Sequence, residues 1–155
     1  MLHFAYGSNM DRRLMRRHCP GAEIVGNAVL RDHRFIIMKE GYASVVPARG
    51  GVVHGLLWRI SPRDLTALNA YENIDAGLYR AASLSVHAAG RAVRALVYLG
   101  RSGVPGRPRL GYMDLVAAAA REAGLPARYV ANLVRIWPSR SAVAPNGETH
   151  GQRRA

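Results

Sequence analysis

The sequence has few of the features that mark secreted or membrane-spanning proteins. It contains a single cysteine, Cys19, so no disulfide can form within the chain and a disulfide-stabilised scaffold is excluded. No apolar stretch approaches the ~18 residues that a membrane-spanning helix requires. The N-terminus also lacks the basic segment, apolar run and cleavage site of a signal peptide. We therefore expect a soluble, cytoplasmic protein without a membrane partner.

Residues that bind metals or act as nucleophiles are few and are not spaced for those roles. The histidines and the cysteine form no H-x-x-x-H or C-x-x-C pair, so we expect no metal and no other cofactor. His18 and Cys19 are adjacent and would point in different directions on a helix, which makes Cys19 a predicted buried hydrophobic residue. Ser8 has no G-x-S-x-G context and no evident base partner. Catalysis by a serine or cysteine nucleophile is therefore not favoured.

Acidic residues are scarce, whereas basic residues are abundant. The chain has 22 basic and 10 acidic residues, and its formal net charge is +12. A charge this large raises the hypothesis of nucleic-acid binding. However, all the basic residues except Lys39 are arginines scattered along the chain, and only two Phe and two Trp are available to stack on bases. We expect a solvated basic surface, no nucleic-acid partner, and a potential that attracts small anions.

The length and composition predict one α+β domain. The chain has 155 residues, of which 49% are hydrophobic, enough for a single core. We expect the domain to span residues 1–138 and the polar tail, 139–155, to be disordered. Periodicity and turn residues predict helices at 10–17, 62–72, 110–123 and 127–136, a turn at 47–51, and strands at 2–6, 22–30, 35–38, 43–46, 52–60, 78–86 and 92–99.

Three local features sharpen this prediction. Asn9 or Asp11 could cap the first helix, and Ser61 with Asp64 has the pattern of a capping box. The segment 101–109 is rich in Gly, Pro and Arg, and loops of this length often cover a site. The loop Tyr6–Met10, sequence YGSNM, joins a strand to a helix. Its glycine allows a close backbone approach, and its N–H groups could bind an anion.

Glu72 is the candidate acid or base. It lies at the predicted end of a helix among Leu68, Tyr71 and Ile74. The helix dipole disfavours a negative charge there and so does partial burial, so both are expected to raise its carboxyl pKa. A carboxyl group titrating near neutral pH suits general acid–base catalysis. From local sequence alone, a solvated glutamate at a helix end is the simpler interpretation, and Asp75 could serve in its place.

Longer motifs identify a family. The stretches that carry the resemblance cover nearly the whole chain except its tail, and the E-x4-G-x-Y arrangement of Glu72, Gly77 and Tyr79 lies at the right distance from the YGSN motif. Together they resemble the gamma-glutamylcyclotransferase family, which includes small bacterial and plant AIG2-like proteins. The stretches are YGSNM (6–10), GVVHGLLWRIS (51–61), LNAYENIDAGLYR (68–80), RALVYL (94–99) and GYMDLVAAAAREAGLPARYVANLVRI (111–136).

This resemblance implies a mixed-strand β-barrel flanked by helices and an enzyme that needs neither metal nor cofactor. Glu72 matches the general acid/base of the family, and Tyr79 matches a tyrosine that lines the pocket. The residues that match the loop around the gamma-glutamyl group are Tyr6, Gly7, Ser8, Asn9 and Met10. The chain departs from the family at Asn73, where glycine is frequent, and in a short connection between residues 38 and 43. Both departures affect the expected choice of substrate.

The implied reaction is intramolecular. The α-amino group of a gamma-glutamyl amide attacks the side-chain carbonyl, and 5-oxoproline and a free amine are released. The amine could be an amino acid, a polyamine or an intermediate of specialised metabolism, and the sequence selects none of these and no oligomeric state. A non-catalytic module that binds glutamyl-like or anionic ligands is the alternative from another class, and retention of Glu72 beside the intact loop argues against it.

Overall fold

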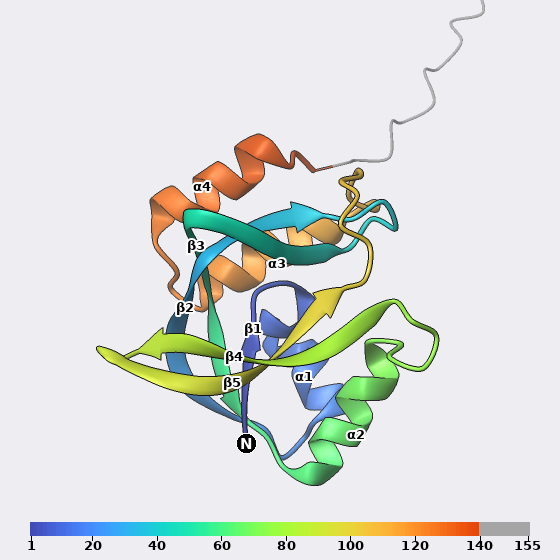
Figure 1. Ribbon diagram of the computed structural model, residues 1–155, viewed down its shortest axis with the longest axis vertical. Helices are drawn as coiled ribbons and strands as arrows, with labels where there is room; N and C mark the ends of the chain where they lie inside the picture. The colour runs from blue at the N-terminus through green and yellow to red at the C-terminus, as the bar shows by residue number, and fades with distance from the viewer. Residues whose placement is uncertain (140–155) are drawn as a thin grey trace, which may run out of the picture.

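A closed β-barrel forms the centre of the protein. The structure is a computed structural model that describes residues 1–139, and in this range the strands follow one another around the barrel in the order β1-β3-β2-β4-β5 (Figure 1). β1 pairs with β3 in antiparallel and with β5 in parallel orientation, and the remaining pairs are antiparallel. The α+β mixed barrel predicted from the sequence is thereby confirmed. The strands are β1 (Leu2–Ala5), β2 (Glu23–Ile37), β3 (Ala43–Arg59), β4 (Tyr79–Ala88) and β5 (Arg91–Gly100).

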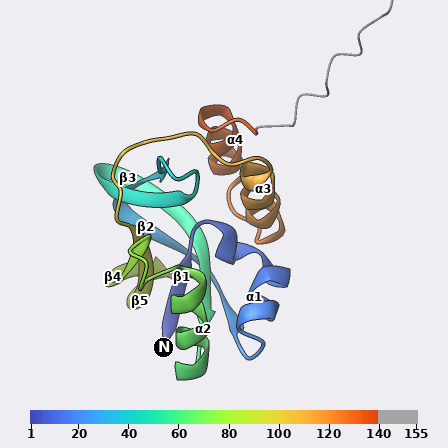
Figure 2. The same cartoon turned by 90° about the vertical axis from the view of Figure 1, so that its right-hand side faces the viewer.

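The helices cover two parts of the barrel. A short 3-10 turn, η1, follows β1 and leads into α1, while α3 and α4 pack against each other and α3 also contacts η1. α1 and α2 lie side by side at the other end of the barrel (Figures 1 and 2). The bounds are η1 (Ser8–Met10), α1 (Arg12–His18), α2 (Pro62–Tyr71), α3 (Tyr112–Glu122) and α4 (Ala127–Ile136). The predicted tail lies outside the described residues, apart from Ser139, whose hydroxyl donates to Asp114.

The helix caps follow the sequence. The Ser61 hydroxyl accepts from the Asp64 N–H, and the Asp64 carboxylate accepts from the Ser61 N–H, so the predicted capping box forms. Of the two candidate caps for α1, Asp11 takes the role: its Oδ1 accepts from the N–H of Leu14 at 2.8 Å. The side chain of Asn9 is therefore free for another partner.

The prediction of four short strands between residues 22 and 60 was wrong. The structure has two long strands, β2 and β3, and the predicted turn at 47–51 lies within β3. β2 instead contains irregularities at Ile24/Gly26 and at Arg31/His33, where Asp32 adopts a φ of 57°. The Asp32 carboxylate accepts from the N–H of Gly50 across the pair. Pro and Gly are tolerated at such a bulge, so they bend the ribbon here without ending it.

One glycine of β3 allows a close contact inside the barrel. A Cβ atom on Gly55 would lie 2.3 Å from the carbonyl oxygen of Ala5 and 2.7 Å from the ring of Phe4. Both neighbours belong to β1, the strand that leads into the YGSNM loop. The absence of a side chain at Gly55 therefore sets how closely β1 and β3 approach.

The loop 101–109 supports the short connection between β2 and β3. The N–H of Lys39 donates to Val104, the N–H of Gly106 donates to Ile37, and the N–H of Arg109 donates to Gly41. The guanidinium of Arg109 also lies 4.7 Å from the centre of the Tyr42 ring. These contacts hold the short connection between β2 and β3 in place, and the expected covering role of the loop stays a prediction.

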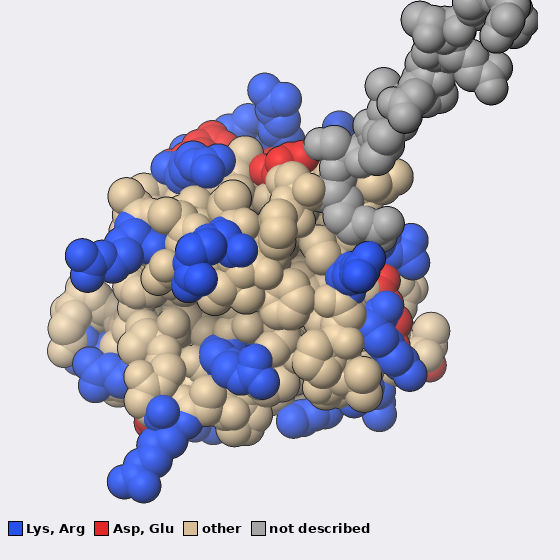
Figure 3. Space-filling model, turned by 90° about the horizontal axis from the view of Figure 1, so that it is seen from above, with Lys and Arg blue, Asp and Glu red and all other residues tan. Residues whose placement is uncertain are grey.

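The basic side chains do not form one continuous patch on the face that Figure 3 shows. Lys and Arg groups there are separated by other residues, and acidic groups lie among them. This arrangement agrees with the expected solvated basic surface. Within residues 1–139, no helix is both long enough and apolar enough to span a membrane.

Candidate active site

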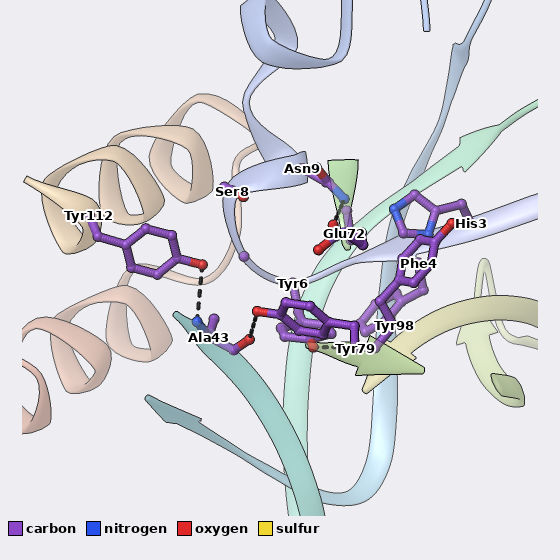
Figure 4. A pocket seen from close by; sticks show the side chains of 12 residues that line it. His3, Phe4, Tyr6, Ser8, Asn9, Ala43, Glu72, Tyr79, Tyr98 and Tyr112 are labelled. Carbon is purple, nitrogen blue, oxygen red and sulfur yellow. Dashed lines mark hydrogen bonds between the residues drawn. The ribbon is translucent and has the colours of Figure 1, made fainter. Parts of the chain in front are cut away.

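Two adjoining cavities lie where the YGSNM loop meets the end of α2. The inner cavity has a volume of about 30 Å³ and the outer one about 200 Å³. They share Ser8, Glu72, Tyr79 and Tyr112, so they adjoin at these residues. Figure 4 shows the residues that line the inner cavity. An inner volume of this size suits a group about as large as one or two water molecules.

The end of α2 fixes the position of Glu72. Asn73 follows it with a φ of 51°, in the left-handed region that glycine and asparagine adopt most readily. The N–H of Asn73 donates to Ala70 and the N–H of Ile74 donates to Asn69, the bonding pattern of a Schellman motif. Asn73 therefore makes the left-handed turn itself, although the family often has glycine at this position.

Glu72 is buried and hydrogen-bonded. The residue is only 9% exposed, and its Oε1 accepts a hydrogen bond from Asn9 Nδ2 at 2.6 Å. Burial raises the carboxyl pKa from its ordinary value of 4.5 to about 7, and the bond from Asn9 works in the opposite direction. Asn9 is itself held by Trp58, whose indole N–H donates to the Asn9 carbonyl at 3.1 Å. The carboxyl group can thus both accept and return a proton near neutral pH.

The YGSNM loop forms the wall opposite Glu72. A Cβ atom on Gly7 would lie 3.1 Å from both Ala43 Cβ and the Tyr112 hydroxyl, so glycine allows the close approach. The N–H groups of Met10 and Asp11 bond back to Gly7 and Ser8. As at the start of any helical turn, the N–H groups of Ser8 and Asn9 have no backbone partner in the described part of the chain.

Met10 is the predicted site residue that the structure does not bring to the site. Met10 lines neither the inner nor the outer cavity, and its side chain is 1% exposed within the core. The η1 turn points Asn9 toward Glu72 and packs Met10 into the interior. Met10 therefore anchors the loop, which the sequence motif alone could not distinguish from binding.

Tyrosines make up much of the remaining wall. The Tyr79 hydroxyl donates to the carbonyl of Ala43 at 2.5 Å, and the Tyr112 hydroxyl accepts from the N–H of Ala43 at 3.1 Å. The Tyr6 hydroxyl donates to the carbonyl of Tyr98. The hydroxyl protons of Tyr79 and Tyr6 are thus engaged in hydrogen bonds within the protein. Tyr112 keeps its hydroxyl proton, because it acts as an acceptor toward Ala43.

The outer cavity is aromatic and carries one acid. Its lining beyond the shared residues consists of Tyr42, Tyr71, Asn73 and Leu78. The Tyr71 hydroxyl lies 3.4 Å from the Ser8 hydroxyl. Tyr42 comes from the short connection between β2 and β3, and Arg109 stacks on its ring. Both departures from the family pattern, Asn73 and this connection, therefore face the outer cavity.

Sequence reasoning missed several lining residues, including His3, Tyr98 and Tyr112 on the inner wall and Tyr42 and Tyr71 on the outer one. Four tyrosines line the inner cavity and two more line only the outer one, so six of the seven in the chain lie here. The excess of tyrosine over the two Phe and two Trp was the signal that could have found them. A hydroxyl-bearing ring suits a wall that is partly apolar and partly wet.

The barrel and its cavity place the protein in a known fold class. A solved structure described as a gamma-glutamyl cyclotransferase matches it with a TM-score of 0.85 at 23% identity, covering 96% of this chain and 94% of that one. The model of the AIG2-like family matches residues 52–133. The chain belongs to this family, as the motifs predict.

Curated relatives extend the likeness along most of the chain. A gamma-glutamylcyclotransferase from Mus musculus is 27% identical over 149 residues, covering 89% of this chain and 79% of the relative. The protein of the same name from Homo sapiens is 26% identical with the same coverage. These are distant relatives, and their names describe their own activity.

Proposed function

We propose that the protein is a gamma-glutamyl cyclotransferase that releases 5-oxoproline and a free amine. The observation that carries this proposal is the buried Glu72 carboxyl group, with a pKa of about 7, facing a loop whose first N–H groups lack a backbone partner. The names of the curated relatives support the same activity. A substrate that contains its own nucleophile needs mainly to be folded into the reactive shape, and such positioning can contribute ~7–11 kcal/mol.

Glu72 moves protons between two nitrogen atoms of the substrate. The α-ammonium group first gives a proton to the Glu72 carboxylate, and the resulting amine attacks the gamma-carbonyl carbon to form the ring C–N bond. Glu72 then protonates the departing nitrogen as the old C–N bond breaks. A second proton follows the same route from the ring nitrogen, so the amine leaves as an ammonium ion and Glu72 ends as a carboxylate.

The loop and Tyr112 can supply hydrogen bonds to the negatively charged oxygens of the substrate. The N–H groups of Ser8 and Asn9 are donors without backbone partners among residues 1–139. The free hydroxyl proton of Tyr112 lies on the same cavity. These groups can donate to the α-carboxylate or to the developing oxyanion. Loss of a single oxyanion donor typically raises the activation barrier by ~2.7–4 kcal/mol.

The outer cavity is the place for the leaving amine. Its wall of tyrosines and Leu78 favours an apolar or aromatic group. A polyamine would bring additional positive charge to a protein of net charge +12, and Glu72 is the one acid among the lining residues described. We therefore expect gamma-glutamyl derivatives of aromatic or large apolar amino acids to react faster than gamma-glutamyl polyamines.

The proposal is tested by measuring 5-oxoproline release from a panel of gamma-glutamyl amino acids and gamma-glutamyl amines. We expect release from the panel, with kcat/KM for gamma-glutamyl-phenylalanine at least about tenfold above that for gamma-glutamyl-spermidine. A reversed order would refute the assignment of the outer cavity. Tight binding of panel members by folded protein without any 5-oxoproline would instead favour the non-catalytic binding module.

The hydrogen bond from Asn9 predicts the pH dependence of the reaction. Because this bond lowers the pKa of Glu72, the substitution Asn9→Ala should raise that pKa above about 7. Glu72 must be ionised to accept the first proton, so the acid limb of the kcat/KM profile should move to higher pH. The backbone bond from Trp58 to Asn9 does not depend on the side chain and should remain.

The matched control for this measurement is Asn27→Ala. Asn27 donates to the carbonyl of Gly124 at an exposed site on β2 and lines neither the inner nor the outer cavity. Its profile should coincide with that of the wild type between pH 5 and 9. An acid limb that stays in place or moves to lower pH in Asn9→Ala would contradict the assignment of Glu72 as the base.

A further inference from the structure

His3 is a buried histidine on the wall of the inner cavity. It lies on β1, is 1% exposed, and pairs with Leu96 of β5. Its Nδ1 lies 3.1 Å from the carbonyl oxygen of Leu96. A carbonyl oxygen only accepts, so in the neutral ring Nδ1 carries the proton and Nε2 presents a lone pair.

The Nε2 atom accepts no hydrogen bond from the described part of the protein. Among residues 1–139, no donor lies within hydrogen-bond distance of it. Loss of hydration lowers the pKa of His3 to about 4, so the ring is neutral when Glu72 titrates. A buried acceptor without a donor is costly, so an unpaired one beside a cavity indicates a missing ligand group or water.

A second residue that lines the same cavity also has a buried acceptor without a partner among residues 1–139. Asn9 donates through Nδ2 to Glu72, and its Oδ1 is buried without a partner in the described part of the chain. Figure 4 shows Glu72 and Asn9 between His3 on one side and Tyr112 on the other. Together with the Glu72 carboxylate, this wall has three acceptor groups around a volume of about 30 Å³. A primary ammonium group offers three N–H donors in a comparable volume.

We propose that His3 Nε2, Asn9 Oδ1 and the Glu72 carboxylate bind the α-ammonium group of the substrate, and that His3 is a substrate-binding residue. This inference rests on the proposed function and deepens it. The neutral acceptors of His3 and Asn9 hold two N–H groups while the third proton passes to Glu72. The two neutral groups thus keep the nitrogen in the inner cavity after it has lost its charge.

The test compares two unreactive ligands that differ in the amino group. L-glutamate has the α-ammonium group and glutarate has hydrogen in its place, and both keep the two carboxylates. Affinities are measured by titration calorimetry for wild-type protein and for His3→Phe. Phenylalanine keeps an aromatic ring beside Tyr98, whose ring centre lies 5.4 Å from that of His3 in the wild type. We expect the substitution to weaken L-glutamate binding by about tenfold to a hundredfold, the usual effect of one hydrogen bond to a charged group. Glutarate binding should change less than about twofold, because it offers no N–H to Nε2.

The matched control is His54→Phe. His54 packs against the ring of Tyr129 at 4.7 Å and lies outside the inner and outer cavities that residues 1–139 form. Both affinities should stay at their wild-type values. Equal losses for both ligands in His3→Phe would make His3 a structural residue and overturn the proposal. Unchanged L-glutamate affinity would overturn it as well, as would wild-type protein that binds L-glutamate no more tightly than glutarate.

A measurement on unsubstituted protein makes the test independent of how His3→Phe folds. The ¹⁵N chemical shift of His3 Nε2 should move toward that of a hydrogen-bonded acceptor when L-glutamate is added, and glutarate should leave it in place. A ¹⁵N chemical shift that does not change when L-glutamate is added would overturn the proposal. Failure of the broader function has a different signature, because it removes 5-oxoproline release from the wild type, whereas failure of this inference leaves release intact.

Discussion

Replacing Glu72 with glutamine should lower kcat by about a hundredfold to ten-thousandfold, the usual contribution of a positioned general acid or base. Glutamine keeps the shape of the side chain and can still accept the hydrogen bond that Asn9 donates to Glu72. It cannot take a proton from the α-ammonium group. The measurement is 5-oxoproline release under saturating substrate, with wild type and Glu72→Gln side by side.

The same substitution should make the fold more stable at pH 8. The pKa of Glu72 is about 7 in the folded state and has an ordinary value of 4.5. The fold therefore loses stability as the pH rises from 4.5 through about 7, because the buried carboxyl group must ionise. The loss amounts to roughly 3 kcal/mol, and glutamine avoids it because it never ionises. Urea unfolding at pH 8 measures this gain. An inactive but stabilised variant cannot owe its inactivity to unfolding.

Asp75→Asn is the matched control for the carboxyl group. Asp75 is exposed, lies three residues after Glu72 in the sequence, and lines neither the inner nor the outer cavity. The change from acid to amide should leave kcat within about twofold of the wild type, as expected for a surface position. If Glu72→Gln kept more than a tenth of the activity, or if Asp75→Asn lost most of it, the acid–base role would belong elsewhere.

Gly55→Ala should lower the free energy of unfolding by about 1–3 kcal/mol, the usual cost of forcing an extra carbon into a packed interior. The new Cβ would lie 2.3 Å from a backbone oxygen of β1, which cannot move away as a flexible side chain could. β1 must then shift, and it carries His3 and the YGSNM loop. We therefore expect a parallel loss of 5-oxoproline release. Urea unfolding monitored by circular dichroism measures the stability change.

Gly21→Ala controls for the loss of glycine itself. Gly21 is exposed between α1 and β2, and no atom of the described chain outside its neighbours lies within 4 Å of where a Cβ would be placed. Its effect on stability should stay within about 0.5 kcal/mol. Equal unfolding curves for Gly55→Ala and the wild type would mean that β1 can move away from β3 at little cost.

The parts of the fold that could be predicted are those encoded by local chemistry. Ser61 and Asp64 predicted the start of α2, and the strands predicted at 78–86 and 92–99 correspond to β4 and β5, a hairpin joined by Ala89 and Gly90. Both hairpin residues have positive φ, 49° and 74°, as a tight two-residue turn requires. The long β2–β3 ribbon could not be predicted in this way. Pro47 and Gly50 favour a turn in isolation, and only pairing with β2 and the hydrogen bond that Gly50 donates to Asp32 keep them in a strand.

The candidate site, like the fold, could be predicted from the sequence only where local motifs encode it. Glu72, Tyr79 and the residues Tyr6–Asn9 were identified from motifs, and the structure brings them to one cavity. Met10 belongs to the same motif but faces the core, because the η1 turn separates neighbouring residues into different environments. His3, Tyr98 and Tyr112 have no motif, since their proximity to Glu72 arises from strands and helices distant in sequence.

By itself, the sequence determined the family, the helix caps and the carboxyl group on which the proposed chemistry depends, because motifs and caps are set by residues within a few positions of one another. Only the tertiary structure decided how far the pKa of Glu72 rises and which residues make up the cavity wall. Both depend on which distant groups exclude water from the end of α2. Closure of the barrel brings β1 and β5 together, and this step places the free nitrogen of His3 beside the cavity.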